Sequence, residues 1–428
     1  MPFAVYLLGL AVFAQGTSEF MLSGLIPGIA RDLQVSIPAA GLLTSAFAVG
    51  MVVGAPLMAV LSLRWSRRFA LLAFLVAFLV VHVVGAVTTS YAVLLGTRVI
   101  AALANAGFLA VAMATAVALA PPDAKGRATS VLLGGVTIAC VAGVPGGALL
   151  GEVWGWRSAF WAVAVALVPA IFAVLRSVPS GTPGSADARV LRSVPSGTPR
   201  SAGPRVLPSV PSGAPGPAGP RARGELRALR RPRLLVLLVL AGLVNGGTFC
   251  TFTYLAPLLT GDTGIGSSWM PLMLALFGLG SFAGVTVSGR VADRRPVRLL
   301  VICGPALAAG WAVFALTAGA PVPAVVLVFV QGTLSFAVGS TLISQVLYAA
   351  IGAPTLAAGF ATAALNVGAT LGPWLGGVTI GAGLGLRSPL WVSALLVAAA
   401  LATAAVAHAV GRPSSAKPVE QDHPAEAQ

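Results

Sequence analysis

The sequence predicts an all-α integral membrane protein whose twelve transmembrane helices form two pseudo-symmetric six-helix bundles. Three observations lead to this prediction. Of the 428 residues, 57% are hydrophobic and only 9% are charged, whereas soluble globular proteins carry about 25% charged residues. Long apolar segments recur along the chain, and its second half repeats its first half at a fixed offset. The composition therefore excludes a soluble protein.

Hydropathy predicts twelve spans, each long enough to cross the ~30 Å hydrocarbon core of a bilayer as a helix. The first span is too long for a cleavable signal peptide and has no basic leader, so we expect it to stay in the membrane. In order, the spans are 3–29, 39–62, 69–88, 92–119, 129–150, 158–175, 234–259, 269–289, 298–319, 322–346, 356–383 and 388–410.

Lysine and arginine are divided unevenly between the alternate connections of these spans. One set of connections holds 22 of them and the other holds 3, while Arg98 lies inside a span. The positive-inside rule therefore predicts that both termini and the middle connection are cytoplasmic, in a multi-pass protein of the bacterial inner (plasma) membrane. The net charge of +15 is explained by this placement and does not indicate a nucleic-acid partner.

Four parts follow from this pattern. Residues 1–176 are predicted to form the first bundle and 234–411 the second, with 412–428 as a cytoplasmic tail. The linker 177–233 contains three 16-residue repeats rich in Pro, Gly, Ser and Arg. A segment of that composition cannot bury a core, so we expect it to be disordered in the cytoplasm.

The two halves repeat each other with an offset of 230 residues. Six helices in each half mean that both halves enter the membrane in the same direction, which is typical of transporters with a parallel repeat. The matched pairs include Phe47 with Phe277, Arg64 with Arg294, Arg68 with Arg298, Arg157 with Arg387 and Trp161 with Trp391.

Glu19 is the acidic residue that we place deep inside a span. An ionised carboxylate at mid-membrane costs roughly 2.5–3.5 kcal/mol on insertion scales, so it indicates a functional site. Gln15, Glu19 and Ser23 are spaced i, i+4, i+8 and are expected to share one helix face. That polar face should point toward other helices or water.

Arg98 lies about seven residues inside the fourth predicted span, and Asn105 shares its helix face. One interpretation is that Arg98 snorkels to the membrane surface. The other is that it faces the protein interior as the electrostatic partner of Glu19, since a nearby cation favours an ionised carboxylate.

Several motifs resemble those of the major facilitator superfamily. GRVADRRPVR, with Gly289, Asp293 and Arg294, is similar to the loop that the family carries after its eighth helix. The copy in the first half, AVLSLRWSRR, keeps Arg64, Arg67 and Arg68 but lacks the acidic residue. TRV at Arg98 resembles the family's fourth-helix motif, and GVPGGALLG resembles its antiporter motif, with a partner in LGPWLGG. The motif positions are Gly143, Pro145, Gly147, Gly151, Gly372 and Pro373.

The resemblance implies roles for these residues. The basic loops would latch the two bundles on the cytoplasmic side, although topogenic charge explains them equally well. The glycine motifs would form gating surfaces, with close helix packing as the alternative. The TRV arginine would take part in proton coupling, and the antiporter motif would imply export in exchange for protons.

Further polar residues inside the spans are candidates for lining a substrate cavity, although each alone is more typical of an interhelical hydrogen bond. They are Asn245, Thr248, Gln331, Ser335 and Asn366, together with Gln15, Ser23 and Asn105. We expect His82 to be structural, because its own helix offers it no polar neighbour. Glu152 and Arg157 are expected to form a structural pair. The three cysteines have no metal-binding spacing, so no metal site is predicted.

Longer stretches, among them QGTSEFMLSGLIP and FVQGTLSFAVGSTLIS, resemble the actinobacterial chloramphenicol-resistance exporters of the drug:proton antiporter branch. The resemblance implies a monomeric, proton-coupled efflux transporter that confers antibiotic resistance, with a small drug and protons as its partners. The alternatives are an exporter of sugars or purine nucleosides and, more remotely, an intramembrane enzyme or receptor. No nucleotide-binding loop follows a strand, so we do not expect ATP to be the energy source. We expect no cofactor, with the proton gradient as the driving force. We also expect no enzymatic activity, because an enzyme would need convergent catalytic groups and the only ionisable groups inside the spans are Glu19, Arg98 and His82.

Overall fold

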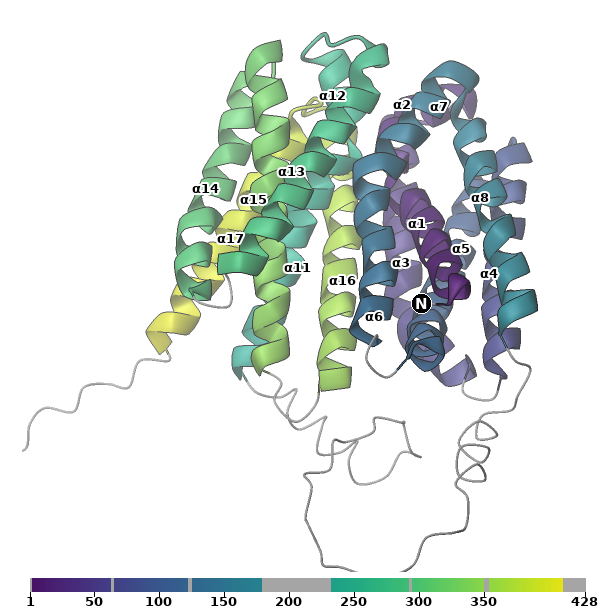
Figure 1. Ribbon diagram of the computed structural model, residues 1–428. Helices are drawn as coiled ribbons and strands as arrows, with labels where there is room; N and C mark the ends of the chain where they lie inside the picture. Colours follow the sequence, from purple (N-terminus) through teal and green to yellow (C-terminus); the bar gives the residue numbers. More distant parts are fainter. Residues whose placement is uncertain are drawn as a thin grey trace, which may run out of the picture.

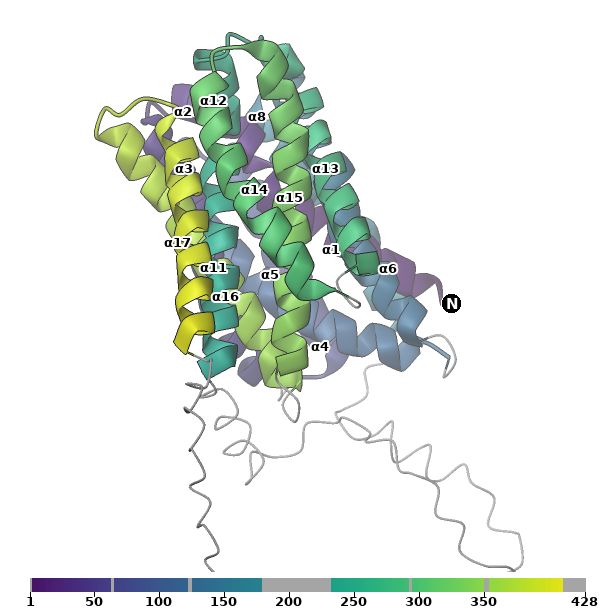
Figure 2. The same ribbon diagram turned by 90° about the vertical axis from the view of Figure 1, so that its left-hand side faces the viewer.

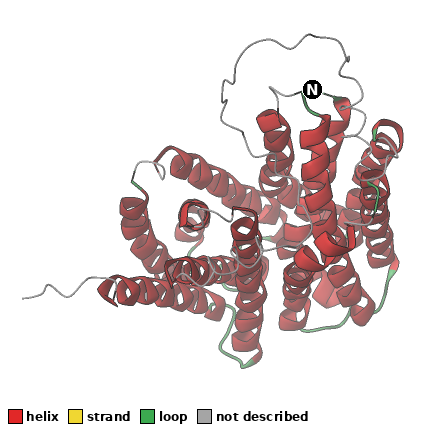
Figure 3. Cartoon of the chain, turned by 90° about the horizontal axis from the view of Figure 1, so that it is seen from below, coloured by secondary structure: helices red, strands yellow, loops and turns green. Residues whose placement is uncertain are grey.

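The computed structural model describes residues 2–62, 65–121, 125–178, 232–291, 295–349 and 354–410. Within these ranges the chain contains no β-strand, and its helices form one all-α molecule (Figure 3). Eleven described segments are long and apolar enough to cross a membrane. The helix that covers the predicted span 356–383 has 28 residues but is not among these eleven segments. It contains several Gly and Thr residues and Asn366.

The first half supplies six spans, two of which are divided. The single helix expected over 3–29 is divided at Met21, and the span expected at 129–150 contains a wide π-helical turn. In chain order the helices are α1 (Phe3–Phe20), α2 (Leu22–Asp32), α3 (Ile37–Ser62), α4 (Arg67–Val87), α5 (Tyr91–Leu119), α6 (Lys125–Ile138), the turn η1 (Ala139–Gly143), α7 (Val144–Trp154) and α8 (Trp156–Ser177).

The second half follows the same plan. Its first span is again divided, here at Tyr254. The helices are α11 (Pro232–Thr253), α12 (Leu255–Gly261), the short 3₁₀ turn η2 (Ser267–Trp269), α13 (Met270–Val291), α14 (Pro296–Thr317), α15 (Pro321–Ala349), α16 (Pro354–Gly381) and α17 (Ser388–Val410). The predicted linker 177–233 and tail 412–428 lie almost wholly outside the described residues.

Each half has its own hydrophobic core. One cluster of buried side chains runs from Val5 to Val178 and draws only on the first half. The second cluster draws on α11–α17 and adds Val144 and Ala148 from α7. Figure 1 shows the corresponding two groups of helices, α1–α8 and α11–α17, side by side, and in Figure 2 the second group lies in front of the first. In lipid such groups are held by close packing and interhelical hydrogen bonds.

The two halves meet mainly where α3 packs on α16, where η1 and α7 pack on α13, and where α2 packs on α12. The hydroxyl of Ser45 on α3 donates to the carbonyl oxygen of Thr370 on α16 over 2.9 Å. At the end of the molecule where α2, α7 and α12 lie (Figure 1), Ser267 donates to Glu152 over 2.7 Å. We call this the α2–α12 end; the charge distribution predicts that it faces outward.

Pro145 explains the π-helical turn η1. A proline inside a helix has no N–H to donate, and its ring collides with the carbonyl group four residues earlier. In η1 the amide of Val144 instead donates to Ala139, five residues back, which widens the turn and makes room for the ring. The turn lies where α6 and α7 meet α13, and it presents Cys140 toward the second half.

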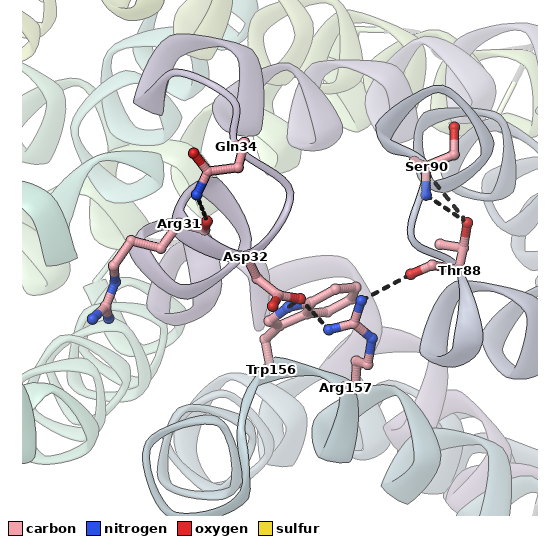
Figure 4. A network of polar contacts seen from close by, with 7 residues as sticks. All are labelled: Arg31, Asp32, Gln34, Thr88, Ser90, Trp156 and Arg157. Carbon is pink, nitrogen blue, oxygen red and sulfur yellow. Dashed lines mark hydrogen bonds and ion pairs between the residues drawn. The ribbon is translucent and has the colours of Figure 1, made fainter.

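Each half contains one ion pair at the α2–α12 end, which we call its clamp. The residues of the second pair lie 230 positions after those of the first. Arg157 binds Asp32 and donates to the carbonyl oxygen of Thr88 over 3.0 Å, while Trp156 also donates to Asp32 (Figure 4). In the second half, Arg387 binds Asp262 over 3.0 Å. The expected pair of Arg157 with Glu152 is therefore wrong, because both side chains have other partners.

Glycines with positive φ precede both clamping arginines. Gly155 has φ +81° and Gly385 has φ +80°, a conformation that other residues adopt only with strain. Ser158 and Ser388 then donate to the carbonyl oxygens of these glycines over 2.7 Å. The repeated turn directs each arginine back over its own half.

Replacing Asp32 by asparagine is expected to destabilise the protein at pH 7. The hydrogen bonds from Arg157 and Trp156 hold the pKa of Asp32 below its usual range. The ion pair therefore stabilises the fold fully above the unfolded-state pKa of about 3.9, and this stabilisation is lost as the pH falls through the lower pKa of Asp32 in the folded protein. Because the pair is partly exposed, we expect a loss of at most about 1 kcal/mol. Thermal unfolding of the purified variants between pH 7 and pH 3 measures this.

Arg31→Gln is the matched control, because the Arg31 side chain points away from Asp32 and only its backbone carbonyl accepts a hydrogen bond, from Gln34 (Figure 4). Equal stability of wild type and Asp32→Asn at pH 7, or a difference that persists unchanged at pH 3, contradicts the assignment of the clamp.

Candidate functional site

Glu19 lies near the end of α1, half-buried, between two groups of residues. Its carboxylate interacts electrostatically with Arg98 of α5 and with Cys140 of η1. Its neighbour Phe20 lines a cavity at the interface of the halves. Glu19 therefore stands between a buried cation in the first half and the interface with the second half.

Arg98 is almost completely buried, with 1% of its surface exposed. Nη1 donates to Ser18 Oγ over 2.9 Å, and Nη2 donates to the carbonyl oxygen of Ser18 over 2.8 Å. The guanidinium also lies 4.6 Å from the ring centre of Phe47, close enough for a cation–π contact. A side chain held in this way does not snorkel to the membrane surface.

A chain of hydrogen bonds continues from Arg98 to His82 on α4. His82 Nδ1 lies 2.7 Å from the carbonyl oxygen of Phe78, which can only accept, so Nδ1 carries a proton. His82 Nε2 lies 2.6 Å from Ser18 Oγ; in the neutral ring it is the acceptor, and the Ser18 hydroxyl donates to it. Arg98 donates to Ser18 and Ser18 donates to His82. The polar neighbour of His82 thus comes from another helix.

The interface cavity is lined mainly by aromatic side chains. Phe20 comes from α1, and the other four rings come from the second half: Phe249, Phe252, Phe277 and Phe336. Its two hydroxyl groups, on Thr248 and Ser281, already donate to carbonyl groups of their own helices. The free volume is about 20 Å³, room for about one water molecule. In this state the cavity is closed around its phenylalanines.

Tyr254, at the break in the first span of the second half, also contacts the first half. Its hydroxyl donates to the carbonyl oxygen of Pro373 on α16 over 2.9 Å. Its ring packs so closely on Gly41 of α3 that a methyl group there would collide with it.

The glycines of GVPGGALLG pack against the first span at matching intervals. A methyl group at Gly143 would collide with the Thr17 hydroxyl, and one at Gly151 would collide with Leu25; at Gly147 it would lie 3.0 Å from Met21 Cβ. Pro145 lies in the first turn of α7. Gly372 contacts the backbone of Gly246 on α11 in the same close manner. These motif residues thus bring helices together within each half.

The eight residues predicted to line a substrate cavity lie in different places. Thr248 lines the interface cavity, and Gln331 lines a narrower cavity beside it. Ser23 lies in α2, beyond the break at Met21, and donates to the carbonyl oxygen of Phe20 over 3.0 Å. Gln15 and Ser335 are buried without a hydrogen-bond partner among the described residues.

The remaining three are asparagines whose side-chain amide groups donate hydrogen bonds to other protein groups. Asn105 contacts Met51 Sδ over 3.6 Å, Asn245 donates to the carbonyl oxygen of Leu365 over 2.7 Å, and Asn366 donates to its own helix at Thr362 over 2.9 Å.

The basic loop motifs fall partly outside the structure. Arg64, Asp293 and Arg294 lie outside the described residues. Gly289 is exposed near the end of α13, and Arg67 is exposed at the start of α4, where Arg68 is half-buried. The latch that these motifs imply stays a prediction. No group of side chains in the described ranges is arranged to hold a metal ion.

The partners that complete the site were not predicted from the sequence. Ser18 precedes Glu19 directly, and the offset of 230 pairs it with Thr248 and pairs Glu19 with Phe249 of the cavity wall. That correspondence could have drawn attention to both positions. His82 and Cys140 gave no such signal, since their contacts depend on how helices from different parts of the sequence pack.

Comparisons with known proteins agree with this architecture. Residues 8–355 match the family model described as Major Facilitator Superfamily. The chain is 54% identical over 404 residues to a protein named chloramphenicol resistance protein from Streptomyces lividans, covering 94% of this chain and 96% of that protein. It is 31% identical to the inner membrane transport protein YdhP of Escherichia coli K12, over 88% of this chain and 89% of that one.

Among solved structures, the chain resembles a bacterial homologue of the human lysosomal transporter Spinster in an inward-facing, occupied conformation. The TM-score is 0.70, with 18% identity, and the match covers 96% of this chain and 98% of that one. At this identity the likeness concerns the fold alone.

Proposed function

The chain belongs to the major facilitator superfamily, and we propose that it exports small amphipathic drugs, chloramphenicol first among them, in exchange for protons. The observation that carries this proposal is the interface cavity with its five phenylalanine rings. Walls of this kind favour a flat, uncharged ring over a sugar, which needs many hydrogen-bonding partners. The name of the Streptomyces relative, 54% identical, supports the same substrate.

Glu19 is the proposed proton carrier. Its carboxylate can be attracted to Arg98 when ionised, while Arg98 has a second set of partners in Ser18 and Phe47 when Glu19 is neutral. Protonation of Glu19 therefore leaves no unpaired cation behind, which is what a reversible proton site needs. Because the neighbouring Phe20 lines the cavity, a change in the charge of Glu19 takes place beside the proposed drug site.

Alternating access follows from the two separate cores. The proposed moving units are residues 1–176 and 234–411, joined by the linker 177–233, with both termini in the cytoplasm. Opening of α3 from α16 would release the drug outward. One proton moving inward gains ~2.3 kcal/mol per 100 mV of membrane potential, which supports a drug gradient of about 50-fold.

Inside-out membrane vesicles test the function. With an acidic lumen, vesicles containing the protein are expected to accumulate radiolabelled chloramphenicol, to lose it on addition of a protonophore, and to leave labelled sugars and purine nucleosides outside. Phe249→Ala should lower the initial rate about tenfold by removing a ring of the cavity wall, since burying such a ring contributes roughly 1.5–3 kcal/mol.

Phe172→Ala is the matched control, because Phe172 on α8 is 57% exposed and does not line the cavity. If a sugar or nucleoside accumulates and chloramphenicol does not, the proposed substrate is wrong. If accumulation survives the protonophore, proton exchange is wrong.

A further inference from the structure

A second cavity lies behind the first, inside the second half. We propose that this pocket, between α11, α13, α14 and α15, binds an uncharged hydroxyl or amide group of the substrate through Trp311 and Gln331. The pocket deepens the proposed function, on which its substrate class rests. Its lining includes Phe252, Phe277, Trp311, Val328 and Gln331.

Two residues that line this pocket each carry a buried polar atom without a hydrogen-bond partner among the described residues. Trp311 is 1% exposed and Gln331 is 0% exposed, yet Trp311 Nε1 and Gln331 Oε1 make no hydrogen bond with any described residue. The free volume of the pocket is about 0 Å³, so no water molecule fits to satisfy them. Buried polar atoms of this kind are destabilising, and a ligand group that bonds them would relieve the cost.

The amide nitrogen of Gln331 holds the side chain in place. Nε2 donates to the carbonyl oxygen of Leu307 on α14 over 3.2 Å, which leaves Oε1 as the free acceptor. The amide lies against Gly310, where a methyl group would come within 2.5 Å of Oε1. Glycine at this position lets the amide approach α14.

Phe252 and Phe277 separate the two cavities. Both rings line the interface cavity and the deeper pocket, and their centres are 4.7 Å apart with the planes tilted by 32°. Rotation of either ring would join the two spaces. A substrate whose aromatic part occupies the interface cavity could then extend a polar group to Trp311 and Gln331.

The pocket contains the counterpart of Arg98 in the internal repeat. The offset of 230 relates Arg98 to Val328, which lines the pocket, and Glu19 to Phe249, which lines the neighbouring interface cavity. The charged pair of the first half is thus replaced by neutral groups in the second half. None of the described residues that line the pocket is charged, so an ionised group would be costly there.

The free groups define the chemistry of the ligand. Trp311 Nε1 is a donor and Gln331 Oε1 is an acceptor, so the best partner carries an acceptor and a donor close together without charge. A hydroxyl or an amide on an aromatic molecule meets this requirement. A hydrocarbon or a carboxylate does not.

Two fluorinated probes test the pocket in full-length protein in nanodiscs, with empty nanodiscs to correct for lipid partition. Fluorine NMR titrations compare 4-fluorobenzamide with 4-fluorotoluene, which has a similar ring without the amide. We expect 4-fluorobenzamide to bind wild type, and Gln331→Leu and Trp311→Phe each to weaken this binding about tenfold. Gly310→Ala, which displaces the Gln331 amide, should do the same.

Thr341→Val is the matched control, because Thr341 is another buried polar residue on α15 whose hydroxyl donates to the carbonyl oxygen of Ala337 on its own helix and which does not line the pocket; its binding of 4-fluorobenzamide should equal that of wild type. Gly339→Ala controls for the glycine change, since a methyl group there meets nothing within 4 Å. Equal binding of both probes to wild type, or unchanged amide binding in all three pocket variants, overturns the proposal. This result is independent of whether the vesicles transport chloramphenicol.

Discussion

Vesicles that contain Glu19→Gln are expected to lose at least nine-tenths of their proton-driven drug accumulation. Glutamine keeps the size of the side chain but can neither release nor take up a proton, so the gradient has no group to act on. Drug should still equilibrate down its own gradient, because the cavity wall is unchanged. The measurement is uptake of labelled chloramphenicol with and without an imposed pH gradient.

Glu152→Gln is the matched control for this change. Glu152 belongs to the same half. It is exposed and accepts a hydrogen bond from Ser267 at the α2–α12 end. It should retain pH-driven accumulation. Accumulation by Glu19→Gln against a gradient at the wild-type level would assign the coupling to another residue.

Arg98→Lys is expected to lower the initial rate of export by about tenfold to a hundredfold, although the charge is kept. Lysine has one compact ammonium group and cannot reproduce the two hydrogen bonds that the guanidinium of Arg98 donates to the hydroxyl and to the carbonyl oxygen of Ser18. Ser18 would lose its position relative to His82, and Glu19 would lose a partner of fixed geometry. Initial rates in vesicles, with expression and thermal unfolding measured alongside, give the effect.

His82→Phe distinguishes the packing role of His82 from its role in the chain of hydrogen bonds that runs from Arg98 through Ser18. A phenyl ring can keep the contact with Phe78, whose ring centre is 4.2 Å away, but it cannot accept from Ser18. If the chain positions Arg98, this variant should fold like wild type and show a lower export rate and a changed pH profile. A wild-type rate and pH profile in both His82→Phe and Arg98→Lys would contradict the role of the chain.

Hydropathy, charge placement and the internal repeat were sufficient to predict the helical class and the spans, because each depends on local composition along the chain. The divided spans were not predicted. Met21 and Tyr254 lie in apolar runs, and hydropathy alone does not register a break there. The eleventh predicted span, 356–383, shows the opposite case: the helix α16 forms there, although it is not among the described segments that are long and apolar enough to cross a membrane.

The site could be predicted only where a residue type is unusual in a membrane. Glu19 and Arg98 were identified because burying a charge is costly, and in the structure they are close enough to influence each other electrostatically. The phenylalanines around the cavity were missed, because phenylalanine is ordinary in an apolar helix. Trp311 and Gln331 show the same limit: their significance lies in atoms without partners, which only three-dimensional packing reveals.

The repeated clamps at the α2–α12 end have a mechanical consequence. Arg157 with Asp32 ties the tip of α8 to that of α2, and Arg387 with Asp262 ties the second half in the same way. Neither clamp joins one half to the other. In the alternating-access mechanism that we propose, each half would therefore move as one body, and the boundary between α3 and α16 would open without bending of the individual helices.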